Sequence, residues 1–130
     1  MAASTRFVVA VVDDDSRTLE SLAELLEAAG YEVRRYSSSR GAWKHGDWSH
    51  VDCLISDVSM PEINGFDLRR LARSVRPDLP VILMTGRSEF RTQYASMIER
   101  ERYFEKPFDG QQLLATIRTA LGHARPSRDP

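Results

Sequence analysis

The sequence predicts an α/β fold, in which helices cover both faces of a five-stranded parallel sheet. Short apolar runs alternate with amphipathic stretches along the chain, and this alternation is typical of repeated βαβ units. Two of the apolar runs close on aspartate, at the strand ends where open parallel sheets gather their ligands. At 130 residues the chain is expected to form one domain with a single core.

The first part of the chain predicts two strands, each followed by a helix. Residues 8–12 form the first strand, and a helix that begins near Ser16 places an apolar stripe on one face until Gly30 ends it. The second strand is expected over residues 32–36. The helix after it is the least regular because Gly41 interrupts it, and we expect a short, mobile element there.

The rest of the chain continues the alternation. Strands are expected over residues 51–56, 81–84 and 103–105, with helices over residues 66–75 and 89–99 between them. Each of these strands is a short apolar run, and each helix has apolar residues on one face. Together with the last helix, these segments give five strands and five helices.

The last helix has the clearest start. Asp109, followed three residues later by Gln112, forms a capping box. An apolar stripe follows, made of Leu113, Leu114, Ile117 and Leu121. The predicted domain covers residues 1–123. Residues 124–130 contain two prolines and no apolar face, and they are expected to be a C-terminal tail or the start of a linker.

Acidic residues follow two of the predicted strands. Asp13 and Asp14 come after the first strand and Asp57 after the third, so they should meet at one edge of the sheet. Carboxylates a few ångströms apart repel by roughly 4 kcal/mol per pair at an effective dielectric near 20. Such a cluster must take up protons or hold a cation, and oxygen ligands suit Mg²⁺ best. Thr85 and Lys106 follow the fourth and fifth strands and add a hydroxyl and an ammonium group.

Five motifs, in this order, resemble the receiver domain of bacterial two-component response regulators. They are Val12-Asp13-Asp14, the segment 56–61 around Asp57, Gly65, Thr85-Gly86 and Lys106-Pro107-Phe108. The resemblance extends from Phe7 to Leu121. It implies a doubly wound, flavodoxin-like α/β fold with strand order 2-1-3-4-5 and five helices.

The resemblance also implies a role for each site residue. Asp57 would be the phosphorylation site and the nucleophile, and Thr85 and Lys106 would complete the catalytic set by binding the phosphoryl oxygens. The expected cofactor is Mg²⁺, because a metal ion neutralises charge in phosphoryl transfer. Its ligands would be Asp13, Asp14, Asp57 and the backbone carbonyl of Ser59.

The resemblance further implies partners and a switch. The phosphoryl donor would be a histidine kinase or a histidine phosphotransfer protein. Thr85 would then move toward the phosphoryl group, and Tyr103 would change between exposed and buried rotamers. The output surface would be formed by the helix 89–99, the strand 103–105 and the last helix, and it would bind an effector or a second copy of the chain. The Lys106-Pro107 bond is expected to be cis.

Composition disfavours several other functions. The net charge of −1 argues against direct nucleic-acid binding through a basic surface. The chain has no apolar run of membrane-spanning length and no export signal, so a cytoplasmic protein without membrane contact is expected. The lone cysteine, Cys53, lies in a predicted strand and is interpreted as a core residue. The three histidines show no metal-ligand spacing.

Two other functions stay open. A degenerate receiver would act as a docking module that does not depend on phosphorylation. A metal-dependent phosphohydrolase would share the chemistry of Asp57, Mg²⁺ and Lys106, but Val58 and Ser59 stand where it would need a second acid. The favoured function is a signalling domain that catalyses its own phosphorylation and dephosphorylation, rather than an enzyme. The segment 97–103 departs from the family because it contains no glycine for a positive-φ turn.

Overall fold

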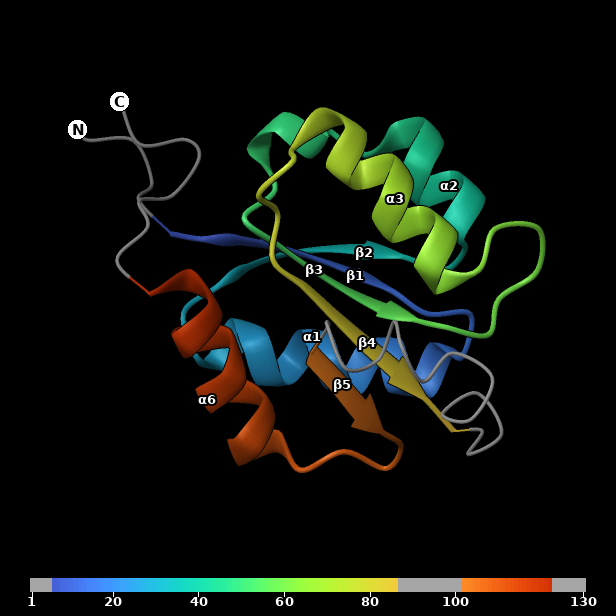
Figure 1. The fold of residues 1–130 in the computed structure, drawn as a ribbon. Coiled ribbons are helices and arrows are strands. Elements are labelled where there is room, and N and C mark those ends of the chain that lie inside the picture. Colours follow the sequence, from blue (N-terminus) through green and yellow to red (C-terminus); the bar gives the residue numbers. More distant parts are fainter. Residues whose placement is uncertain (1–5, 87–101, 123–130) are drawn as a thin grey trace.

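The computed structural model describes residues 6–86 and 102–122, and its sheet has the expected topology (Figure 1). Five parallel strands lie in the order β2-β1-β3-β4-β5. The strands are β1 (Val8–Val12), β2 (Glu32–Tyr36), β3 (Cys53–Asp57), β4 (Val81–Thr85) and β5 (Arg102–Glu105). The doubly wound α/β fold predicted from the sequence is confirmed.

The strand register sets up one shared edge. Val12 pairs with Ser56, so Asp13 and Asp57 are neighbours at the ends of β1 and β3. Thr85 pairs with Glu105, so Lys106 leaves β5 beside the end of β4. The backbone amide of Lys106 also donates a hydrogen bond to the Thr85 carbonyl, at 2.9 Å. All four residues therefore come to the carboxyl edge of the sheet, where ligands bind in open parallel sheets.

Helices cover both faces of the sheet (Figure 1). α1 (Ser16–Ala28) and α6 (Gly110–Leu121) lie on one face, and α2 (Ser39–His45) and α3 (Gly65–Val75) lie on the other, with a short 3₁₀ helix, η1 (Trp48–His50), after α2. Alternate residues of the central strands point into the two cores because strand side chains alternate between faces. Each face has its own buried apolar cluster.

Side chains cap each α-helix of the described ranges at its amino end. Asp15, Ser38, Asn64 and Asp109 are the N-caps of α1, α2, α3 and α6, and each accepts a hydrogen bond from a backbone N–H of the first turn. The Asp109 cap confirms the predicted start of the last helix. α2 is short, as expected, with seven residues.

The third strand begins later than predicted. It starts at Cys53 instead of residue 51, because Val51 ends the 3₁₀ helix. Asp52 is buried, and its carboxylate accepts a hydrogen bond from the Val8 amide at 2.7 Å. This side chain takes the place of a backbone acceptor before β3 begins, a substitution that periodicity does not encode.

The predicted core cysteine and both tryptophans lie in or against the two cores. Cys53 is fully buried, and burial raises the pKa of its thiol to about 12, which suits a core residue. Trp48 is buried and Trp43 packs against the same core cluster. Within the described ranges, no helix is long and apolar enough to cross a membrane. The helix expected over residues 89–99 and the tail 124–130 lie outside those ranges.

Candidate functional site

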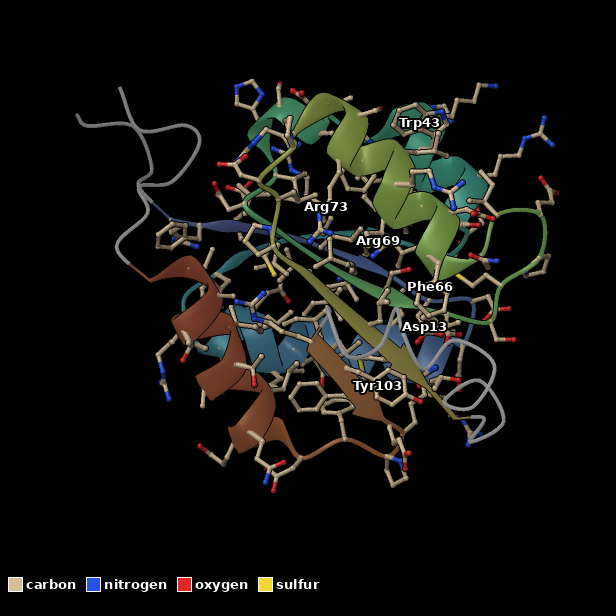
Figure 2. The ribbon with its side chains drawn as sticks, in the orientation of Figure 1. Asp13, Trp43, Phe66, Arg69, Arg73 and Tyr103 are labelled. Carbon is tan, nitrogen blue, oxygen red and sulfur yellow. The ribbon has the colours of Figure 1, made fainter. Side chains whose placement is uncertain are left out.

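The three acidic residues at the sheet edge come together as predicted. Oxygen atoms from Asp13, Asp14 and Asp57 all lie within 4.8 Å of one another. Asp13 and Asp57 are buried at the ends of β1 and β3, whereas Asp14 is exposed. Figure 2 shows Asp13 at this edge of the sheet. Oxygen atoms at this spacing can share one hard cation such as Mg²⁺, with its other positions left for water or ligand.

Lys106 places its ammonium group among these carboxylates. Its Nζ lies 2.7 Å from Oδ2 of Asp13 and 3.6 Å from Oδ2 of Asp57. The lysine is partly buried, so its charge is less screened than it would be on an open surface. The ammonium therefore already acts as a cation within the acidic cluster, which supports the fit of these residues to a metal ion.

The acidic cluster and its burial change the pKa of Asp57. Burial raises this pKa to about 6, the charges of Asp13 and Asp14 add to the rise, and Lys106 opposes it. Burial alone would lower the pKa of Lys106, but its hydrogen bond to Asp13 and the nearby carboxylates outweigh burial and raise it. Asp57 is thus still largely ionised at neutral pH, in a site that resists its charge.

The loop between β3 and α3 folds back against Asp57. The amide of Ser59 donates a hydrogen bond to Oδ1 of Asp57 at 3.3 Å. The amide of Gly65 donates to the carbonyl of Val58 at 2.9 Å and closes the loop. Ser59, predicted as a site residue, thus contacts the carboxylate through its own amide.

Gly65 is a glycine because the backbone passes too close for a side chain. A Cβ at this position would meet the Asp57 carbonyl oxygen and would lie 2.9 Å from the Cα of Val58. Neither backbone atom can move aside without shifting the end of β3. We expect Gly65→Ala to lower the free energy of unfolding by about 1–3 kcal/mol, which urea denaturation would measure.

The matched control for this change is Gly110→Ala at the start of α6. A Cβ there would lie 3.4 Å from the flexible side chain of Leu25, an ordinary contact. We expect this variant to keep wild-type stability or gain slightly, since alanine favours helix. Equal stability of the Gly65 and Gly110 variants would contradict the close approach at Gly65.

Thr85 lies next to Lys106 at the sheet edge, and Tyr103 lies further back on β5, opposite Leu83. Thr85 is buried at the end of β4, and a cavity of about 80 Å³ next to it is lined by Thr85, Gly86, Glu105 and Lys106. Tyr103 lies on β5 (Figure 2) and is partly buried. It packs against the core cluster of α2 and α3. The Lys106-Pro107 bond is cis, as the resemblance implied.

The sequence did not predict a cleft that lies beside Asp14, next to the acidic cluster. This cleft of about 450 Å³ is lined by α2 and by the β3–α3 loop. Most of its lining residues are polar or charged, and they come from the loop after β1, from the segment 37–44 and from the β3–α3 loop: Asp14, Ser37, Ser38, Arg40, Gly41, Lys44, Pro61 and Glu62. Asp14 and Pro61 belong to motifs already named, but no motif marks the lining residues between 37 and 44, and a run of serines before a short helix is ordinary capping sequence. The signal available for residues 37–44 was only their position after strand β2, at the same sheet edge.

Comparison with known proteins decides the family. The profile of the response regulator receiver domain matches residues 9–118, which is most of the chain. The chain belongs to the response regulator receiver domain family. This receiver domain is therefore a signalling domain of the two-component type rather than a conventional enzyme, as the sequence motifs predicted.

The receiver domain has bacterial relatives that are longer. It is 37% identical over 127 residues to the DNA-binding transcriptional regulator NtrC of Rhizobium meliloti (strain 1021), covering 97% of this chain and 26% of NtrC. It is 34% identical over 118 residues to the response regulator protein TmoT of Ectopseudomonas mendocina, covering 88% of this chain and 52% of TmoT. The chain thus spans about a quarter of one relative and half of the other.

Solved structures agree with this assignment. The signal receiver domain of an HD domain-containing protein from Pseudomonas fluorescens Pf-5 has a TM-score of 0.81 and 28% identity, over 95% of this chain and 92% of that chain. A putative response regulator from Chloroflexus aurantiacus J-10-fl has a TM-score of 0.79 and 30% identity, over 91% of this chain and 99% of that one. The receiver domain shares their fold over nearly its whole length.

Proposed function

We propose that this receiver domain is a phosphoacceptor switch that takes a phosphoryl group onto Asp57 from a phosphohistidine. The donor would be a histidine kinase or a histidine phosphotransfer protein in the cytoplasm. The observation that carries the proposal is the arrangement around Asp57, whose carboxylate shares a cluster with Asp13 and Asp14 and lies 3.6 Å from the Lys106 ammonium. Such a site can both present a nucleophile and neutralise an arriving anion.

The acidic cluster fits Mg²⁺. Asp13, Asp14 and Asp57 would supply carboxylate oxygens, and the backbone carbonyl of Ser59 would complete the protein ligands. When bound, Mg²⁺ would neutralise negative charge and align donor and acceptor for phosphoryl transfer. The raised pKa of Asp57, caused first by burial and then by its acidic neighbours, supports a site that gains from a cation.

The chain's own residues would carry the transfer as follows. A carboxylate oxygen of Asp57 bonds to phosphorus while the phosphorus–nitrogen bond to the donor imidazole breaks. The imidazole keeps the electron pair of that bond and takes a proton from solvent. Lys106 and the hydroxyl of Thr85 bind the oxygens of the acquired phosphoryl group, and attack by water later returns Asp57 to its free form.

Mass spectrometry of the intact protein tests this proposal. After incubation with acetyl phosphate and Mg²⁺, we expect one added phosphoryl group. We expect no addition when a chelator removes divalent cations, because the carboxylates then repel the anionic donor. Labelling that is unaffected by the chelator would contradict the cation site. Absence of labelling under all conditions, including with phosphorylated kinases, would favour the docking-module alternative.

The switch would run from Thr85 to Tyr103 and on to the surface of β5, α6 and the segment 89–99. This surface would bind an effector or a second copy of the chain. The new anion on Asp57 offers strong acceptor oxygens, so the Thr85 hydroxyl is drawn toward it and leaves space that Tyr103 fills. The positions of the two residues support this switch, since Thr85 borders the 80 Å³ cavity and Tyr103 belongs to β5, the strand that pairs with β4.

Replacing Thr85 with alanine tests the switch. We expect Thr85→Ala to accept a phosphoryl group at a rate reduced by less than about tenfold, since Asp57 and its acidic neighbours are unchanged. Phosphorylation should no longer shift the ring resonances of Tyr103 in NMR spectra, because the moving hydroxyl is gone. If those resonances shift as in the wild type, the signal does not pass through Thr85.

A further inference from the structure

Ser39 has a buried hydroxyl that the helix itself does not need. It is the first residue of α2 and only 1% exposed. The preceding residue, Ser38, is the N-cap and accepts from the Gly41 amide at 3.0 Å. The Ser39 hydroxyl instead donates to the carbonyl of Pro61, at 3.4 Å and 22 residues away. A buried hydroxyl is kept where its hydrogen bond has a use, since burying it unpaired is costly.

A second contact from α2 reaches the same turn. Arg40 donates to the Glu62 carboxylate at 2.9 Å, and both residues line the cleft beside Asp14. Glu62 has a φ of +69° and is the one non-glycine residue with positive φ in the part of the chain that the structure describes. Such a backbone conformation persists only when the surroundings hold it. The Ile63 amide closes this turn by donating to the Pro61 carbonyl at 2.8 Å, and the two contacts from α2 support it from outside.

This turn belongs to the loop that orients Asp57. The loop starts at Val58, and the Ser59 amide donates to the Asp57 carboxylate. Met60 and Ile63 on either side of the turn pack against the core cluster of α2 and α3. Between them, the Pro61 carbonyl accepts from the Ile63 amide within the turn and from the Ser39 hydroxyl, which ties the turn to α2. A shift there would be passed through two residues to the Ser59 amide.

We propose that Ser39 is a positioning residue for the acceptor, acting through the β3–α3 loop to hold the Ser59 amide on the Asp57 carboxylate. Arg40 and Glu62 support the same turn from the solvent side, where an exposed ion pair contributes less. This inference deepens the proposed function and rests on Asp57 being the acceptor. It assigns to α2, the least regular helix of the sequence, a part in preparing the site.

The experiment compares Ser39→Ala with Ala42→Gly. Ala42 is a buried residue of the same helix, and its methyl group makes no hydrogen bond to the loop, so its replacement loosens α2 without removing the contact to Pro61. Two quantities are measured for each variant: the NMR chemical shifts of the Ser59 amide and the Asp57 carboxyl carbon, and the initial rate of phosphorylation by acetyl phosphate with Mg²⁺.

For Ser39→Ala we expect both chemical shifts to move and the rate to fall about tenfold, because small misplacements of reacting groups are costly. We expect Ala42→Gly to stay close to the wild type in both quantities. Unchanged shifts in Ser39→Ala, or equal losses in the two variants, would overturn the positioning role. If the wild-type protein takes up no phosphoryl group, the proposed function fails and the chemical shifts alone decide whether Ser39 orients Asp57.

Discussion

Asp57→Asn is expected to abolish phosphorylation of this protein by small phosphodonors and by phosphohistidine. The asparagine side chain has nearly the same shape, and its oxygen can still accept from the Ser59 amide. It has no negative charge and is a far weaker nucleophile, so no acyl phosphate forms. Loss of a nucleophile lowers rates by at least about 10³-fold, and intact-protein mass spectrometry with acetyl phosphate and Mg²⁺ would measure the loss.

Asp78→Asn is the control for this change. Asp78 is exposed and precedes β4, so it lies at the opposite edge of the sheet from Asp57. This variant should take up one phosphoryl group as the wild type does. Persistent labelling of Asp57→Asn at the wild-type rate would show that another residue accepts the phosphoryl group. Binding of a partner equally well by both variants, before and after phosphodonor treatment, would support the docking module.

The same Asp57→Asn change is expected to stabilise the fold when no divalent cation is present. Burial and the acidic neighbours raise the pKa of Asp57 from its ordinary 3.8 to about 6, so its charge opposes folding. At neutral pH the variant should gain up to about 3 kcal/mol in free energy of unfolding, at 1.36 kcal/mol per pKa unit. Urea denaturation with a chelator would measure the gain.

The pH dependence of this gain has a definite sign. Between about pH 4 and pH 6 the folded wild-type protein binds the Asp57 proton more tightly than the unfolded chain does. Wild-type stability, measured relative to Asp57→Asn, should therefore rise as pH falls through this window. The gain should be largest above pH 6 and small near pH 4, and Mg²⁺ at neutral pH should reduce it. A gain that is the same at every pH would contradict the electrostatic cause.

The sequence was a good guide to residues whose signals are local. The Asp109 cap and the strand over residues 32–36 were predicted where the structure places them, because capping and strand periodicity act within a few positions. The predicted start of β3, residue 51, was wrong by two residues. There the Asp52 carboxylate accepts a hydrogen bond from the Val8 amide, 44 residues away in the sequence, and no short-range pattern predicts that contact.

The candidate site divides in the same way. The position of Asp13, Asp14, Asp57, Thr85 and Lys106 at strand ends could be predicted, since parallel strands bring their carboxyl ends to one edge. The sequence could not predict which of these carboxylates the Lys106 ammonium would contact most closely. Its ammonium lies 2.7 Å from Asp13 and 3.6 Å from Asp57, a difference set by the packing of separate strands.

The sequence by itself determined which chemical groups this protein brings to the sheet edge, because strand ends, caps and motifs depend on residues that are close together in the sequence. Only the tertiary structure decided how these groups act on one another. The raised pKa of Asp57 depends on exclusion of water by the fold. The hydrogen bond from the Ser39 hydroxyl to the Pro61 carbonyl joins segments 22 residues apart. Burial and long-range distances arise only once the chain is packed, and the electrostatics of the site follow from them.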